Sequence, residues 1–281
     1  MASGIQWLDA SLAAFFGLLF GSFMNVVVLR LPKMMEQQWA AECASLQGHE
    51  PAASEPFNLI VPRSRCPHCG HGIRWFENIP LLSYMALRGR CSACKAPISM
   101  RYPLVEITTA ALFFFCIWQW GVTATGLAWC AFSGILLTLA LIDWDTTYLP
   151  DDLTLPLLWL GLIAAQFQWT GIGLSDALWG AVAGYLALWS VFWGFKLLTG
   201  KDGMGYGDFK LLAALGAWFG WQTLLPIILM ASIVGAVVGI AMKINSSLRE
   251  GGYVPFGPFL AGGGFSALFF GADSLQRAIG L

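Results

Sequence analysis

Two aspartates stand next to apolar runs, where an ionisable side chain is costly. Asp143 follows the unbroken apolar run 134–142, and Asp208 follows a segment of alternating glycines that includes Gly205 and Gly207. A carboxylate at the edge of a bilayer is a functional candidate by default. If the two carboxylates meet, they repel each other and share one proton, as in aspartic proteases. The ionised one would then activate a water molecule, and the protonated one would polarise the carbonyl under attack.

The glycines before Asp208 leave one side of the backbone without side chains. Because a second backbone can approach such a segment closely, we assign Gly205 and Gly207 to binding an extended peptide substrate. The alternative is a glycine-rich turn in which Asp208 is the N-cap of the next helix. Asp152 follows Pro150 closely and precedes an apolar run, so it is expected to cap the orphan N–H groups of its own helix.

Four cysteines form two Cys-x-x-Cys pairs in a polar part of the chain: Cys66, Cys69, Cys91 and Cys94. Each pair can direct two thiolates at one tetrahedral Zn²⁺, and four protein ligands with no open position define a structural site. A thiol-exchange role is the alternative. A reducing cytosol favours metal over disulfides, so we predict one zinc ion per chain. His68 and His71 lie nearby and could each replace a thiolate.

The composition indicates a membrane protein that binds no nucleic acid. Of the 281 residues, 57% are hydrophobic and only 11% are charged, and the net charge of −1 lacks the basic character that phosphate binding needs. A membrane-spanning helix takes about 20 mostly apolar residues. Eight windows qualify: 10–30, 104–120, 123–143, 153–170, 175–198, 208–220, 222–242 and 255–271. The window 208–220 is short and is expected to form a broken or tilted helix.

The only long polar segment, residues 31–103, predicts a small extramembrane domain. Zinc would stabilise it, because the loop is too small to build its own core. We therefore expect an all-α polytopic protein with a first transmembrane helix (1–30), this zinc-binding domain and a membrane domain of about seven helices (104–281). Most lysines and arginines fall in every second loop along the chain. Because such residues are retained on the cytosolic side, those loops and both aspartates are expected in the cytosol and the N-terminus outside.

Competing catalytic groups are absent from the neighbourhood of the aspartates. All three histidines, His49, His68 and His71, lie in the polar loop, which argues against a serine–histidine triad or a histidine-ligated catalytic zinc. The main alternative is a proton- or cation-coupled transporter, in which Asp143 and Asp208 relay protons or bind a cation and the zinc loop gates access. Glycine-interrupted spans fit that alternative, but no internal repeat relates the two halves of the chain.

Several segments together resemble the motifs of one known family. Asp143 is followed by Leu149-Pro150-Asp151, and Gly205-Tyr206-Gly207-Asp208 forms a Gly-x-Gly-Asp motif. Further matches are 21–27, 30–32, the paired cysteines with Glu77-Asn78-Ile79-Pro80 between them, and 101–106. These segments resemble the type IV prepilin leader peptidases, membrane aspartyl proteases that also methylate the new N-terminus. The resemblance covers nearly the whole chain and implies that Asp143 and Asp208 are the catalytic aspartates.

The resemblance also implies a substrate class and a second activity. The substrates would be type IV prepilins and pseudopilins of type II secretion, cleaved at the cytosolic face of a bacterial inner membrane. The N-terminus of the enzyme would be periplasmic, and membrane lipid would surround its helices. The new N-terminal residue, usually phenylalanine, would receive a methyl group from S-adenosylmethionine. No Gly-x-Gly-x-x-Gly turn marks a site for that donor. Glu77 and Asn78 are the candidates, with a simple turn before Pro80 as the alternative.

Overall fold

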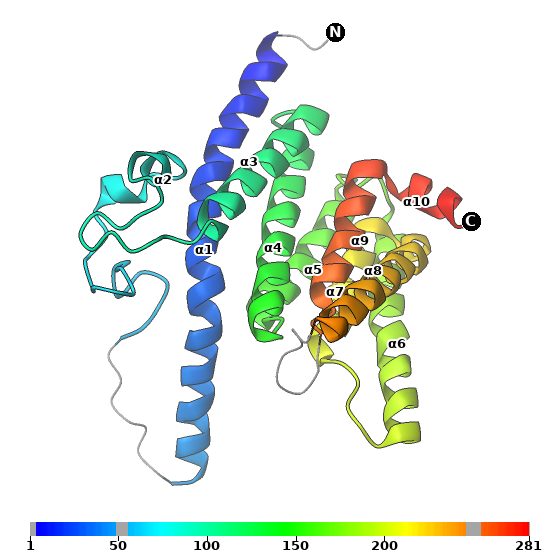
Figure 1. Cartoon of the computed structure of the whole chain (residues 1–281). Helices are drawn as coiled ribbons and strands as arrows, with labels where there is room; N and C mark the ends of the chain where they lie inside the picture. Colours follow the sequence, from blue (N-terminus) through cyan, green and yellow to red (C-terminus); the bar gives the residue numbers. More distant parts are fainter. Residues whose placement is uncertain (1–3, 49–55, 246–253, 281) are drawn as a thin grey trace. The chain divides into compact units, whose positions relative to one another are not determined.

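The protein is helical over the residues that the structure describes. This computed structural model describes residues 4–48, 56–245 and 254–280, so His49 lies outside the described residues. Figure 1 shows α1 (Gly4–Leu46), α2 (Leu82–Ala86), α3 (Arg101–Trp120), α4 (Ala124–Thr146), α5 (Asp151–Gln166), α6 (Leu174–Thr199), α7 (Tyr206–Phe219), α8 (Leu224–Ile244), α9 (Gly257–Phe270) and α10 (Ala272–Ala278). Two 3-10 turns accompany them, η1 (Trp75–Asn78) and η2 (Trp221–Thr223). Within these ranges, β pairing is limited to two isolated bridges, Arg65–Gly72 and Arg90–Pro97.

Five of the described helices are long and apolar enough to cross a membrane. They are α1 from Ile5, α3, α4, α6, and α8 together with η2. The eight windows expected from the sequence coincide with α1 and with α3 to α9, which confirms an all-α polytopic fold. At about 1.5 Å per residue, the 14 residues of α7 extend only about 21 Å. This helix is short but continuous, so of the two expected forms the break is wrong, and the tilt stays a prediction.

The chain folds as two compact units, Met1–Gly134 and Ile135–Leu281. In the first unit, α1 packs along α3. A methyl group added at Gly17 would lie 2.7 Å from Cα of Ala110, and one added at Gly21 would lie 2.7 Å from Cα of Glu106. Two glycines four residues apart therefore let the helix backbones approach closely, as small residues do in membrane helix pairs.

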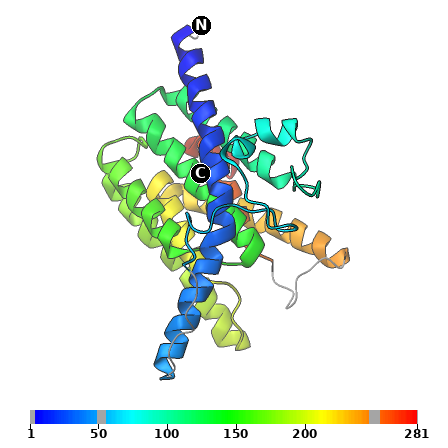
Figure 2. The same ribbon diagram turned by 90° about the vertical axis from the view of Figure 1, so that its left-hand side faces the viewer.

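Helix α1 extends well beyond the apolar window that predicted it. Both ribbon views, Figures 1 and 2, show one continuous helix that passes through Pro32 and ends at Leu46. Residues 31–46 are thus a helical extension of the first apolar segment. Their sequence is rich in alanine, glutamate, glutamine and methionine, which are strong helix formers. The cysteine turns lie in the irregular segment 56–100, which connects α1 to α3.

The second unit is organised around α7. This helix packs against α5, α6 and α9, and nearly all of its side chains from Asp208 to Phe219 are buried. Glycines again set the close approach: a methyl group added at Gly184 of α6 would lie 2.6 Å from the carbonyl oxygen of Leu212 in α7. One turn earlier in α6, Gly180 faces Gly216 of α7. This packing fixes the position of Asp208 in the first turn of α7.

Candidate active site and metal centre

Asp143 lies near the end of α4 and is almost completely buried, with 4% of its surface exposed. Its carboxylate oxygen Oδ2 accepts a hydrogen bond of 2.9 Å from the backbone N–H of Gly257, the first residue of α9. The N-terminus of a helix carries free N–H donors and the positive end of the helix dipole, so it stabilises a nearby carboxylate. The start of α9 therefore holds Asp143 in place.

Asp208 is the third residue of α7 and is 7% exposed. The N-cap of α7 is Gly205, whose carbonyl accepts the backbone N–H of Asp208 at 3.3 Å and whose N–H donates to the Asp208 carboxylate. The alternative that Asp208 is itself the N-cap is thus wrong. The carboxylates of Asp143 and Asp208 interact electrostatically, so the structure brings the two predicted residues together.

Leu149 packs against Gly207 and Gly257, the glycines next to Asp208 in sequence and hydrogen-bonded to Asp143. A methyl group added at Gly207 would lie 2.6 Å from Cβ of Leu149, and one added at Gly257 would lie 3.2 Å from Cδ1 of the same leucine. The two predicted substrate-binding glycines thus differ in the space beside them, because Leu149 covers Gly207. A methyl group added at Gly205 would meet nothing closer than 3.9 Å, and Oδ2 of Asp208 would be 4.0 Å away. The open backbone beside the carboxylates is therefore at Gly205.

Gly257 is a site residue that our sequence analysis missed. A methyl group there would lie 2.6 Å from Oδ2 of Asp143, so the hydrogen bond to Asp143 requires glycine at this position. The local sequence could have indicated a helix start here, because Gly257 stands between Phe256 and Pro258 at the start of the last apolar window. A proline in the first turn marks a helix start, which the apolar periodicity alone does not locate.

A salt bridge joins the first turns of α5 and α7. Nζ of Lys210 lies 2.7 Å from each carboxylate oxygen of Asp151, and this pair is partly exposed. Its neighbour Asp152 is the second helical residue of α5, while Pro150 occupies the N-cap without a side-chain cap hydrogen bond. The expected capping role of Asp152 is wrong, because α5 begins two residues earlier than the capping pattern requires.

The four predicted metal ligands converge in the first unit. The sulfur atoms of Cys66, Cys69, Cys91 and Cys94 all lie within 4.8 Å of one another, and the Sγ atoms of Cys66 and Cys94 are 3.8 Å apart. A tetrahedron with Zn–S bonds of about 2.3 Å has edges of about 3.8 Å. The thiols therefore fit one Zn²⁺. Among the described residues, this group includes neither His68 nor His71.

The two Cys-x-x-Cys turns are built alike. In each, the fourth residue after the first cysteine donates its N–H to the carbonyl of that cysteine, from Gly70 to Cys66 at 2.9 Å and from Lys95 to Cys91 at 3.1 Å. Both donors adopt the left-handed conformation, with φ of 70° and 62°. That conformation disfavours a lysine, so the turn geometry prevails over the local preference of Lys95.

Backbone donors favour the thiolates that a metal requires. The N–H of Cys69, and then that of His68, lower the pKa of the Cys66 thiol to about 7. The N–H groups of Cys94 and Ala93 lower the pKa of Cys91 in the same way. Since zinc binds the deprotonated thiol, these backbone donors favour metal binding at Cys66 and Cys91.

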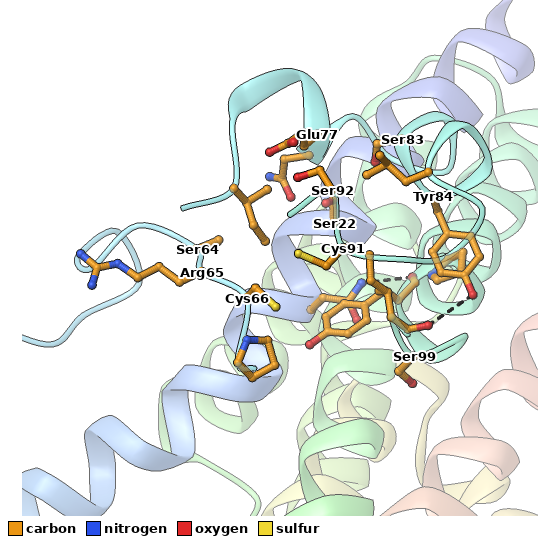
Figure 3. A pocket seen from close by; sticks show the side chains of 18 of the residues that line it. Ser22, Ser64, Arg65, Cys66, Glu77, Ser83, Tyr84, Cys91, Ser92 and Ser99 are labelled. Atoms are coloured by element: carbon orange, nitrogen blue, oxygen red, sulfur yellow. Dashed lines mark hydrogen bonds between the residues drawn. The ribbon is translucent and has the colours of Figure 1, made fainter. Parts of the chain in front are cut away.

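Glu77 and Asn78, the candidates for binding the methyl donor, belong to η1 and line a cavity of about 500 Å³ in the first unit. Figure 3 shows Glu77 beside this cavity together with Cys66 and Cys91. The Glu77 carboxylate accepts the backbone N–H of Arg74 at 2.9 Å and lies 3.5 Å from Nε2 of His71. The Arg74 N–H is the main reason that the pKa of Glu77 is lowered.

Comparison with known proteins assigns most of the chain to described families. The model of the bacterial peptidase A24 N-terminal domain matches residues 15–120, and that of the type IV leader peptidase family matches residues 130–240. No solved structure matches the chain. The transporter alternative finds no support among these matches.

The curated relatives cover nearly the whole chain. A protein of Pseudomonas aeruginosa named prepilin leader peptidase/N-methyltransferase is 56% identical over 93% of this chain and 90% of its own length. Proteins of the same name from Aeromonas hydrophila and Stutzerimonas stutzeri are 51% and 54% identical, over 99% and 91% of this chain and 96% and 88% of their own lengths. The resemblance noted in the sequence is thereby confirmed, and the chain belongs to the type IV leader peptidase family.

Proposed function

We propose that this protein removes the leader peptide of type IV prepilins and pseudopilins and then methylates the new N-terminal amine. The single observation that carries the peptidase activity is the pair of buried carboxylates, Asp143 and Asp208, each held by a helix N-terminus. The names of the relatives carry the second activity.

Hydrolysis would follow the chemistry of two carboxylates that share one proton. The ionised carboxylate takes a proton from a water molecule as the water oxygen bonds to the scissile carbonyl carbon. The protonated carboxylate donates to the carbonyl oxygen and stabilises the tetrahedral intermediate. When the C–N bond breaks, the carboxylate that took the water proton gives it to the leaving nitrogen, and a hydroxyl of the intermediate returns a proton to the other carboxylate. The substrate backbone would pass the open side of Gly205, while Gly207 maintains the contact with Leu149 that supports the site.

The site would face the cytosol of a bacterium from its inner membrane. The excess of lysine and arginine in one set of loops supports a periplasmic N-terminus and a cytosolic zinc domain. A prepilin with its leader in the cytosol and its apolar helix in the bilayer would then present the cleavage junction at the membrane surface. The four cysteines would hold one structural zinc ion in the cytosolic segment.

The proposed activity is tested by incubating the purified protein in detergent with a prepilin. We expect the wild type to shorten the prepilin on a gel and, with S-adenosylmethionine, to add the mass of one methyl group to the product. Asp143→Asn and Asp208→Asn should each abolish cleavage. The matched control is Asp152→Asn, an exposed carboxylate at the start of α5, which should cleave normally. Retained cleavage in either of the first two variants would contradict the assignment.

A further inference from the structure

The cavity of about 500 Å³ in the first unit is large enough for a small organic ligand, since such sites measure roughly 300–1,000 Å³. It lies between α1, the start of α3 and the cysteine turns, and Figure 3 labels Ser22 of α1 together with Glu77 and Tyr84 of the connecting segment among the lining residues. All of its lining residues belong to the first unit, whereas both aspartates belong to the second. The cavity lining therefore contains neither Asp143 nor Asp208.

Several residues that line the cavity are apolar. They include Val26 and Leu29 of α1, Ile73 and Pro103, and the ring of Tyr84 also lines the cavity. The hydroxyl of Tyr84 donates to Sδ of Met100 at 2.9 Å, which holds the phenol ring in one orientation. Aliphatic and aromatic side chains of this kind suit a flat heteroaromatic ring.

The lining also includes a buried carboxylate. Glu106 of α3 is 7% exposed, its Oε2 accepts the N–H of Leu81 at 2.8 Å, and the Ser22 hydroxyl hydrogen-bonds the same carboxylate. In the part of the chain that the structure describes, no lysine or arginine forms a salt bridge with Glu106. A buried carboxylate is costly unless it is paired, so this one suits a cationic ligand.

Leu81, which Glu106 holds, has a φ of 57°, in the left-handed region that a leucine rarely adopts. The hydrogen bond from its N–H to α3 therefore fixes a strained residue of the loop that carries Glu77. Glu77 itself lies four residues earlier and adds a second carboxylate to the lining. Asn25 and Asn78 add amide groups. Basic side chains line the cavity as well, among them Arg65 and Arg30, and the guanidinium of Arg30 donates to the backbone carbonyls of Asn58 and Pro62.

We propose that this cavity binds S-adenosylmethionine, the methyl donor of the proposed second activity, on which this inference rests. The donor joins a purine, a ribose with two hydroxyls and a cationic sulfonium. The apolar side chains of the lining suit the purine. Carboxylates accept hydrogen bonds from ribose hydroxyls, and they also attract the sulfonium cation. A nucleoside triphosphate or dinucleotide presents phosphates in place of the sulfonium, so it offers no cation to the buried carboxylate of Glu106.

The bound donor supplies an electrophilic methyl group, which forms a bond to the lone pair of the substrate amine while the sulfur keeps the electrons of the broken C–S bond. The positive charge passes from sulfur to nitrogen. The amine must first lose a proton to solvent. An α-amino group has a pKa of about 7.7–8.0, so a useful fraction is unprotonated near neutral pH.

Equilibrium binding of radiolabelled S-adenosylmethionine to the full-length protein, without prepilin, tests the proposal independently of catalysis. Glu106→Gln preserves the shape of the side chain and an acceptor for Leu81 but removes the charge. A hydrogen bond to a charged group contributes enough that its loss should weaken binding about tenfold or more. Glu77→Gln should also weaken binding. Glu36→Gln, on the exposed surface of α1, is the matched control and should bind as the wild type does.

Two further measurements keep the outcome independent of variant folding. Ultraviolet cross-linking of the labelled donor to the wild type should label peptides from 22–30 or 64–106, and excess ATP should not prevent it. Binding that is equal in the wild type and both glutamine variants, labelling elsewhere, or displacement by ATP would overturn the cavity assignment alone. A wild type that neither binds the donor nor methylates its product would overturn the proposed methylation as well.

Discussion

The cysteine cluster and the aspartate pair are held in place in opposite ways. Across the segment 56–100, only four residues are buried, Cys66, Pro80, Gly89 and Cys91. Two of these four are metal ligands, so the segment has almost no hydrophobic core of its own. Asp208 instead lies in the first turn of α7, which is buried from Asp208 to Phe219 except at Lys210 and packs against α5, α6 and α9.

This difference shows what each site depends on. The cysteine segment has too few buried apolar side chains to fold by itself, so zinc would supply the stabilisation that a core normally gives. The aspartates need no metal, because the packing of α7 and the start of α9 position them. Changes at the metal should therefore affect the first unit, and changes at the helix starts should affect cleavage.

The largest effect is expected from removing the metal. Cys66→Ser with Cys91→Ser deletes both buried ligands, and structural zinc contributes on the order of 10 kcal/mol to small domains. We expect zinc to fall from one ion per chain to none by metal analysis, and segment 56–100 to become sensitive to protease. Cys43→Ser changes an exposed cysteine outside the cluster and should keep the zinc. Zinc retained by the double variant would refute the metal assignment.

A smaller but specific effect is expected at the start of α9. Gly257→Ala places a methyl group 2.6 Å from Oδ2 of Asp143 and must displace it. Misplacement of a catalytic group by about 1 Å can cost about 100-fold in rate, so cleavage should slow by that order while zinc content stays at one. Gly262→Ala, in the same helix with open space around it, is the control. Equal cleavage rates for the two variants would show that Gly257 does not position Asp143.

The smallest effect is expected at the salt bridge between α5 and α7. Lys210→Met removes a partly exposed pair, and such pairs contribute about 0.2–1 kcal/mol. Cleavage should therefore slow by no more than about fivefold. The difference from the wild type should shrink in high salt, which screens the charges in the wild type. The exposed Lys201 provides the control, Lys201→Met, which should leave the rate unchanged at both salt concentrations.

The sequence predicted the features that are local and missed those that depend on packing. Apolar windows located eight helices, and the spacing of Cys66 to Cys94 indicated one cluster, because both signals lie within short stretches of chain. Spacing cannot show that Gly257 donates to Asp143 across 114 residues, since only the fold joins α9 to α4. The hydrogen bond between Glu106 and Leu81 was not predicted for the same reason. Apolar periodicity assigns Glu106 to a helix but does not identify its hydrogen-bond partner.

The central claim is that Asp143 and Asp208 act as one catalytic pair. The most direct test measures the prepilin cleavage rates of Asp143→Asn, Asp208→Asn and the variant that carries both substitutions, each with zinc content measured on the same sample. Catalytic residues that act as a unit are strongly non-additive, so each single variant should lose at least about 1,000-fold and the double variant no more than either single one. Substantial cleavage in a single variant, or losses that multiply in the double variant, would contradict the account.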